Sequence, residues 1–104
     1  MNKTPMELLK HFAPEFAQSQ MEEKSLIFEN STYQKVPNKY KMLIGIGVAA
    51  ALGSDTCTQM WTNMAKQNNI TNEEIVEAMQ VARYMKQATV NDTIANSLRI
   101  LKGE

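Results

Sequence analysis

The sequence predicts an all-α protein, and three observations support this prediction. Apolar residues recur at spacings of three and four, strand-like alternation is absent, and capping residues stand before the apolar runs. The chain has 104 residues, 43% of them hydrophobic, which is enough for one packed domain over residues 1–104. We expect about five to six helices.

Two helices that begin at proline are predicted in the N-terminal part of the chain. A short helix is expected from Pro5 to about His11, with Thr4 as its cap. A second is expected over residues 14–29. Its apolar stripe is predicted to contain Phe16, Met21, Leu26 and Ile27. Residues 30–37 contain Ser, Thr and Pro and predict a loop.

The predicted helix over residues 39–52 is the most unusual segment. The twelve residues from Met42 to Gly53 carry no charge, and this run is too short to span a bilayer, which takes about 20 residues. A helix that is apolar on every side belongs in a core. Gly45, Gly47 and residues 49–51 are small, so neighbouring helices can approach closely. A 104-residue monomer has few other helices to cover this one, so we expect a homo-oligomer.

The next helix is predicted to begin after Gly53, with Ser54 or Asp55 as its cap, and to end near residues 68–69. Its apolar stripe has the spacing i, i+3, i+4, i+7, i+8 and consists of Cys57, Met60, Trp61, Met64 and Ala65. The sequence Thr71-x-x-Glu74 predicts a capping box before a further helix. A separate final helix is expected from about Thr89 to Leu101.

Composition excludes several classes of function. The formal net charge is zero, which gives no attraction to nucleic acid or anionic lipid. One cysteine excludes an intramolecular disulfide and a multi-cysteine metal site. There is no metal-ligand spacing and no glycine-rich phosphate loop, so no cofactor is expected. The first residues lack an apolar signal core, which predicts a cytoplasmic protein without a membrane segment.

From Pro37 to Ala82 the chain resembles the carboxymuconolactone decarboxylase and AhpD-like alkylhydroperoxidase family. The resemblance rests on an ordered set of features: Lys39-Tyr40-Lys41-Met42-Leu43-Ile44, the alanine-rich Ala49-Ala50-Ala51-Leu52-Gly53, the segment Ser54-Asp55-Thr56-Cys57-Thr58-Gln59-Met60-Trp61, and the capped Ile70-Thr71-Asn72-Glu73-Glu74-Ile75. The resemblance implies an AhpD-like helical fold and assembly of identical chains into a hexamer or trimer.

The peroxidase branch of that family carries Cys-x-x-Cys-x-x-x-His, with a glutamate twelve residues before the first cysteine. The first thiolate attacks peroxide, the second thiol resolves the oxidised intermediate, and the other two groups move protons. Carried over by position, the two cysteines fall on Ser54 and Cys57, the histidine on Trp61 and the glutamate on Met42. Only one of the four groups is retained, so the motif is degenerate.

Two functions therefore remain open. The first is a non-catalytic family member, a small-molecule-binding or oligomeric protein in which Met42, Ser54 and Trp61 line an apolar pocket. The second is an AhpD-like thiol peroxidase, an antioxidant protein with peroxiredoxin-type activity that uses Cys57 with an external thiol. Cys57 itself has two interpretations: a reactive thiol near a helix start, or an inert thiol buried in the apolar stripe.

Overall fold

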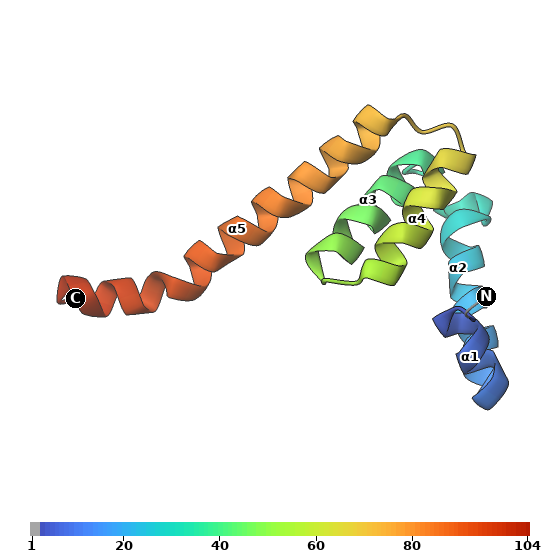
Figure 1. The fold of residues 1–104 in the computed structure, drawn as a ribbon, viewed down its shortest axis with the longest axis horizontal. Helices are drawn as coiled ribbons and strands as arrows, with labels where there is room; N and C mark the ends of the chain where they lie inside the picture. The colour runs from blue at the N-terminus through green and yellow to red at the C-terminus, as the bar shows by residue number, and fades with distance from the viewer. Residues whose placement is uncertain (1–2) are drawn as a thin grey trace. The chain divides into compact units, whose positions relative to one another are not determined.

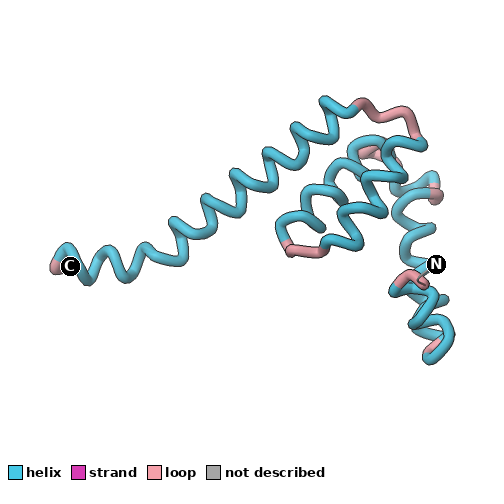
Figure 2. Tube along the Cα trace, viewed as in Figure 1, coloured by secondary structure: helices cyan, strands magenta, loops and turns pink. Residues whose placement is uncertain are grey.

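The computed structural model describes residues 3–104, and every regular element in that range is a helix (Figures 1 and 2). The chain divides into two compact units, residues 1–38 and residues 39–104. The first contains α1 (Pro5–Phe12), α2 (Pro14–Phe28) and the short 3-10 helix η1 (Ser31–Tyr33). α3 (Asn38–Ala51), α4 (Asp55–Gln67) and α5 (Asn72–Lys102) form the second. The predicted all-α class is confirmed.

Helices α1 and α2 begin as the sequence predicts. Thr4 caps α1 and forms a capping box with Glu7, and a proline occupies the start of each helix. The predicted apolar stripe of α2 is wrong, because Ala17 is the buried residue of this helix. The four stripe residues are exposed: Phe16, Met21, Leu26 and Ile27. They are spaced by five, five and one residues, which distributes them around the helix instead of along one side.

Small residues let the three helices of the second unit pack closely. Gly45 of α3 faces Trp61 of α4, and a Cβ atom built on the glycine would lie 3.6 Å from the indole ring. A Cβ on Gly47 would lie 3.9 Å from Cβ of Ala82 in α5. The buried core of the unit consists of Met42, Ile46, Ala49, Ala65, Ile70, Ile75 and Ala82.

Two contacts show that α5 runs in the same direction as α3. An ion pair joins Lys39 to Glu74 near the starts of the two helices, and Gly47 lies beside Ala78 and Ala82 further along. Since α3 ends at Ala51, this register leaves residues 87–102 of α5 beyond the end of α3. We call these residues the arm. At 1.5 Å per residue the arm is about 24 Å long.

Helix α5 is continuous over 31 residues, so the prediction of a separate helix from Thr89 to Leu101 is wrong. The break expected before Thr89 is absent, and the helix continues through residues 89–97, which are mostly weak helix formers. Eight of these nine residues have intrinsic helix propensities well below that of alanine, a total cost of about 4–5 kcal/mol. Helix stability in proteins comes mostly from packing of an apolar face, and the apolar side chains of the arm are exposed in this unit.

Candidate functional site

Ser54 occupies the turn between α3 and α4, where it completes both helices. Its backbone N–H donates to the carbonyl oxygen of Ala49 at 2.9 Å, which closes the end of α3. Its Oγ accepts the backbone N–H of Cys57 at 3.2 Å, and this hydrogen bond caps α4. Gly53 precedes it with φ of +77°, a conformation that favours glycine. The hydroxyl at the position of the first motif cysteine is therefore a helix cap.

Cys57 lies in the first turn of α4 with its side chain exposed. The interpretation of Cys57 as a buried thiol of the apolar stripe is therefore wrong. Along the same stripe Met60 is also exposed, and Ala65 is the fully buried member. The stripe turns away from Cys57 because the core contacts of α4 begin one turn later, at Trp61.

Trp61 is partly buried, with its indole ring packed on the backbone of α3 at Gly45. Three ring atoms lie 3.6–3.9 Å from the place that a Cβ atom of Gly45 would occupy. Those are ordinary van der Waals distances. The position that holds histidine in the peroxidase motif is thus filled by a ring that joins two helices.

Met42 lies three residues before Gly45 on α3 and is 7% exposed. Its thioether contributes to the core and has no acidic or basic group with which to move a proton. Met42 therefore lies in the core one turn before Gly45, the residue of α3 on which Trp61 packs.

The ionisable group with a strongly shifted pKa is a different residue, Glu74. The hydrogen bond with Lys39 and further hydrogen bonds from Thr71 lower the pKa of Glu74 to about 2. The same partnership raises the pKa of Lys39. Glu74 is the acid of the predicted capping box, and its Oε1 accepts from the Thr71 hydroxyl at 2.9 Å. The capping box was readable in the sequence, whereas nothing in the local pattern assigns Lys39 as its partner.

The cluster of Lys39, Thr71 and Glu74 fixes the starts of α3 and α5. Its shifted pKa values keep both charged groups ionised at neutral pH, so neither acts there as a proton donor or acceptor. The single histidine of the sequence, His11, lies on α1 in the other unit, edge-on to Phe12 with ring centroids 4.8 Å apart.

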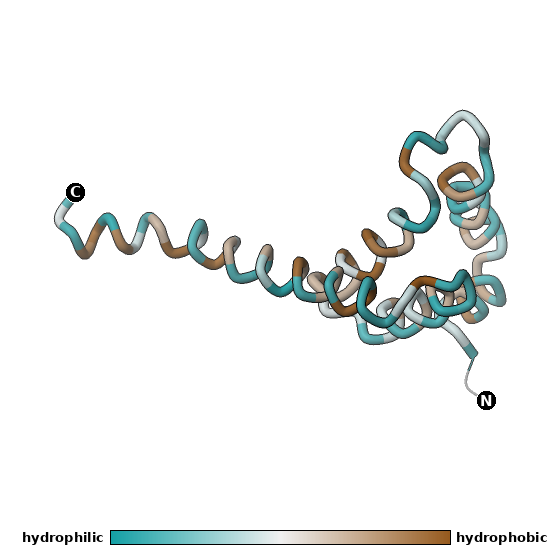
Figure 3. The backbone as a smooth tube through the Cα atoms, turned by 90° about the horizontal axis from the view of Figure 1, so that it is seen from above, coloured by the Kyte–Doolittle hydropathy of each residue, from teal (hydrophilic) through white to brown (hydrophobic). Residues whose placement is uncertain are grey.

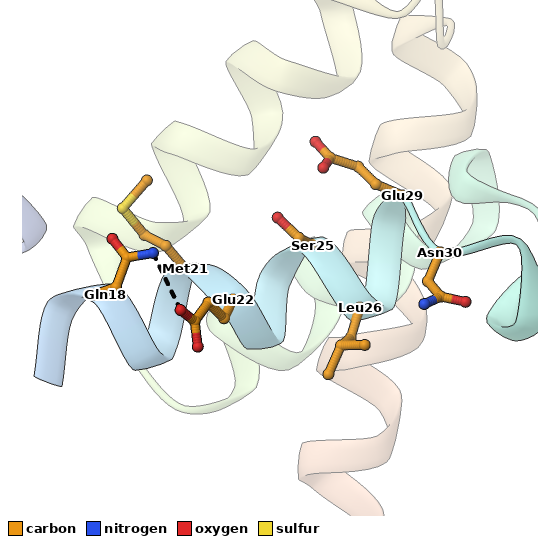
Figure 4. A pocket seen from close by; sticks show the side chains of 7 residues that line it. All are labelled: Gln18, Met21, Glu22, Ser25, Leu26, Glu29 and Asn30. Atoms are coloured by element: carbon orange, nitrogen blue, oxygen red, sulfur yellow. Dashed lines mark hydrogen bonds between the residues drawn. The ribbon is translucent and has the colours of Figure 1, made fainter. Parts of the chain in front are cut away.

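Two shallow depressions occur on the helices of the first unit. The larger follows α2 and is lined by Gln18, Met21, Glu22, Ser25, Leu26, Glu29 and Asn30 (Figure 4). In it the Gln18 amide donates to Glu22 at 3.2 Å. The other lies between α1 and α2. Neither is lined by Met42, Ser54, Cys57 or Trp61.

Among residues 3–104, no group of three or more His, Cys, Asp or Glu side chains could hold a metal ion. None of the helices described combines the length and the apolar character that crossing a membrane requires.

Comparison with known proteins agrees with the order of features along the chain. The sequence profile of the carboxymuconolactone decarboxylase family matches residues 14–95. Neither a curated protein nor a solved structure matches the chain. Because the matched range covers most of the sequence, the chain belongs to the carboxymuconolactone decarboxylase family.

Proposed function

We propose that this member of the carboxymuconolactone decarboxylase family is a non-catalytic protein, oligomeric and able to bind an apolar small molecule. The observation that carries the proposal is the hydrogen bond of Ser54, whose Oγ caps α4 at the backbone N–H of Cys57. A thiol at position 54 would be the partner of Cys57 in the family motif, and the hydroxyl cannot replace it. Serine forms neither a sulfenic acid nor a disulfide.

The other two substituted positions support the same conclusion. Trp61 packs on Gly45 and Met42 is part of the core, so both side chains hold helices together. Proton transfer by a positioned acid or base is commonly worth about 10²–10⁴-fold in rate, and neither side chain supplies it. The partly buried ring of Trp61 offers an apolar and polarisable surface, which suits an apolar ligand better than a charged one.

A single family domain over residues 1–104, located in the cytoplasm, completes the proposal. The matched range of residues 14–95 includes parts of both compact units, which supports one family domain over two separate ones.

Self-association is supported by exposed apolar side chains on every long helix. Examples are Phe16 on α2, Ile44 on α3 and Leu98 on α5, which are all about half exposed or more. Large exposed apolar side chains in this number are typical of proteins that bury them in contacts with other chains. Zero net charge adds no repulsion between copies. We propose a hexamer or a trimer.

A second candidate function is favoured by the exposure of Cys57. The Cys57 thiolate would attack a hydroperoxide, forming an S–O bond and breaking the O–O bond, and an alcohol would leave after protonation. A low-molecular-weight thiol would then displace water from the sulfenic acid, giving a mixed disulfide. A second such thiol would release the Cys57 thiol and a small disulfide. This route would give antioxidant, peroxiredoxin-type activity without a second cysteine in the chain.

Restoration of the family motif tests the assignment of positions. The variant that combines Ser54→Cys, Trp61→His and Met42→Glu is expected to form a disulfide between positions 54 and 57 on mild oxidation. Mass spectrometry of the digested protein would detect it, with Ser54→Cys plus Cys57→Ser as the matched control that cannot close. A folded variant with both thiols free would contradict the assignment.

The fluorescence of Trp61, the single tryptophan, tests the binding of an apolar ligand. A long-chain alcohol that binds beside the indole ring is expected to shift its emission in a saturable way. The matched control is Gly45→Leu, which places a side chain against the ring. Saturable binding that is equal in the two proteins, or emission that never responds, would contradict a site at Trp61.

A further inference from the structure

Helix α3 carries a continuous apolar row on the side that faces away from α4 and α5. The row is defined by a spacing of four residues and consists of Tyr40, Ile44, Val48 and Leu52. Each of these side chains is more than half exposed. On the other sides of α3, Gly45 contacts the ring of Trp61 in α4, and Gly47 contacts Ala78 and Ala82 in α5. The row is therefore the part of α3 that the other helices of this unit leave uncovered. We call it the α3 row.

The arm of α5 carries a second apolar row of similar length. It consists of Val90, Ile94, Leu98 and Leu101, which are 40–83% exposed. Apolar residues recur along α5 up to its last turns (Figure 3). Beside the row lie uncharged polar residues, among them Gln87, Asn91 and Ser97. Lys86 and Lys102 continue the four-residue spacing at its two ends, so the centre of this surface is apolar and a lysine stands at each end.

The two rows match each other in length and character. The α3 row covers twelve residue steps and the arm row eleven, so both are about 17–18 Å long. Rows with four-residue spacing are the ridges that interlock when two helices pack. Three members of the α3 row, Ile44, Val48 and Leu52, lie in the longest uncharged stretch of the chain, residues 42–54. Lys41 stands next to Tyr40 at the end of the row, so the centre of the contact buries no charge.

Within one chain the two rows cannot meet while α5 stays helical. The pairing of Lys39 with Glu74 and of Gly47 with Ala78 and Ala82 holds α5 alongside α3. From there the helix continues in the same direction past Ala51, which carries the arm away from the α3 row. The occupant of each row must come from outside this unit of the chain.

We propose that the arm of one copy packs on the α3 row of a second copy. The inference rests on the proposed homo-oligomer and names the surfaces that build it. One arm on one α3 row involves four large apolar side chains from each copy, roughly 100 Å² each, or about 400 Å² per partner. When two copies exchange arms reciprocally, eight side chains of each copy are covered, which reaches the about 800 Å² per partner of a standard interface. The contact also places the weak helix formers of residues 89–97 in a packed environment.

Substitutions on the arm test the exchange in the intact protein. Leu98→Asp places a charge in the arm row and is expected to weaken assembly at least 100-fold. Ile100→Asp is the matched control, because Ile100 is 74% exposed and lies on another side of the arm. Light scattering after size exclusion, across a range of concentrations, would measure the mass of each variant, and circular dichroism would report on its folding.

Cross-linking between copies tests which surfaces meet. In a Cys57→Ser background, chains with Val48→Cys are mixed with differently tagged chains with Ile94→Cys and oxidised. A disulfide between the two kinds of chain is expected, and the Val48→Cys with Ile100→Cys pair is expected to give at least 10-fold less. Two results would overturn the inference. One is a disulfide that forms only between two Ile94→Cys chains. The other is a disulfide within a single chain that carries both Val48→Cys and Ile94→Cys.

The two proposals fail in distinguishable ways. A wild-type protein that is a monomer at every concentration would overturn both the oligomer and the exchange of arms. A wild-type oligomer that Leu98→Asp leaves intact would overturn only the exchange of arms.

Discussion

Replacement of Trp61 by alanine measures how much the α3–α4 contact contributes to stability. Truncation of a fully buried tryptophan costs about 3–5 kcal/mol. Trp61 is only partly buried, but its ring lies against Gly45 at van der Waals distance, so we expect a loss of about 2–3 kcal/mol. A loss of this size would show that the contact between the Trp61 ring and the α3 backbone stabilises the protein.

Urea unfolding followed by circular dichroism suits this measurement, since the variant lacks the single tryptophan. Protein concentration must be equal for both proteins, because assembly contributes to apparent stability. Met60→Ala is the matched control on the same helix: its side chain is 46% exposed and should cost less. A loss below about 1 kcal/mol for Trp61→Ala would refute the assignment of the ring to the helix contact.

Three further results are expected. Ser54→Ala should destabilise the protein by about 1 kcal/mol in urea unfolding and Ser54→Gly by a few tenths, as for other helix caps; equal losses would contradict the capping role. Gly45→Ala should be neutral or raise the unfolding free energy by up to about 1 kcal/mol, since the added methyl group meets the indole ring at 3.6 Å; a large loss would show that the ring sits closer. Glu74→Gln should flatten the dependence of the unfolding free energy on acid pH. The pKa of the Glu74 carboxyl is about 2 in the folded protein, so the wild type loses stability as pH falls from about 4.5 towards 2. Equal losses of urea stability in the two proteins between pH 7 and 3 would contradict the pairing of Glu74 with Lys39.

The sequence predicted the helices whose signals are local. Pro5, Pro14, the Thr71–Glu74 capping box and Gly53 each fix a helix end through groups a few residues apart, and the structure confirms all of them. The continuity of α5 was not predicted, although residues 89–101 were expected to be helical. The residues before them, Lys86, Gln87 and Ala88, contain no cap, glycine or proline that would fix a helix end there.

The candidate site was predictable in its positions but only partly in its burial. The family resemblance selected Ser54, Cys57, Trp61 and Met42, and the structure shows Ser54 as a cap between α3 and α4 and Met42 in the core near the start of α3. The exposure of Cys57 depends on the rotation of α4 against α3, which the packing of Trp61 on Gly45 sets. Spacing along the sequence does not contain that rotation.

Steady-state consumption of an organic hydroperoxide in the presence of a dithiol tests the degenerate motif most directly. The wild-type protein is expected to exceed Cys57→Ser by no more than the slow background of a free thiol, because Ser54, Trp61 and Met42 supply neither a resolving thiol nor a proton-transfer group. That background arises because the exposed Cys57 thiol can be oxidised by the hydroperoxide and reduced again by the dithiol. Turnover at least 100-fold above that of an equal concentration of free cysteine, lost in Cys57→Ser, would contradict the non-catalytic function and establish the thiol peroxidase in its place.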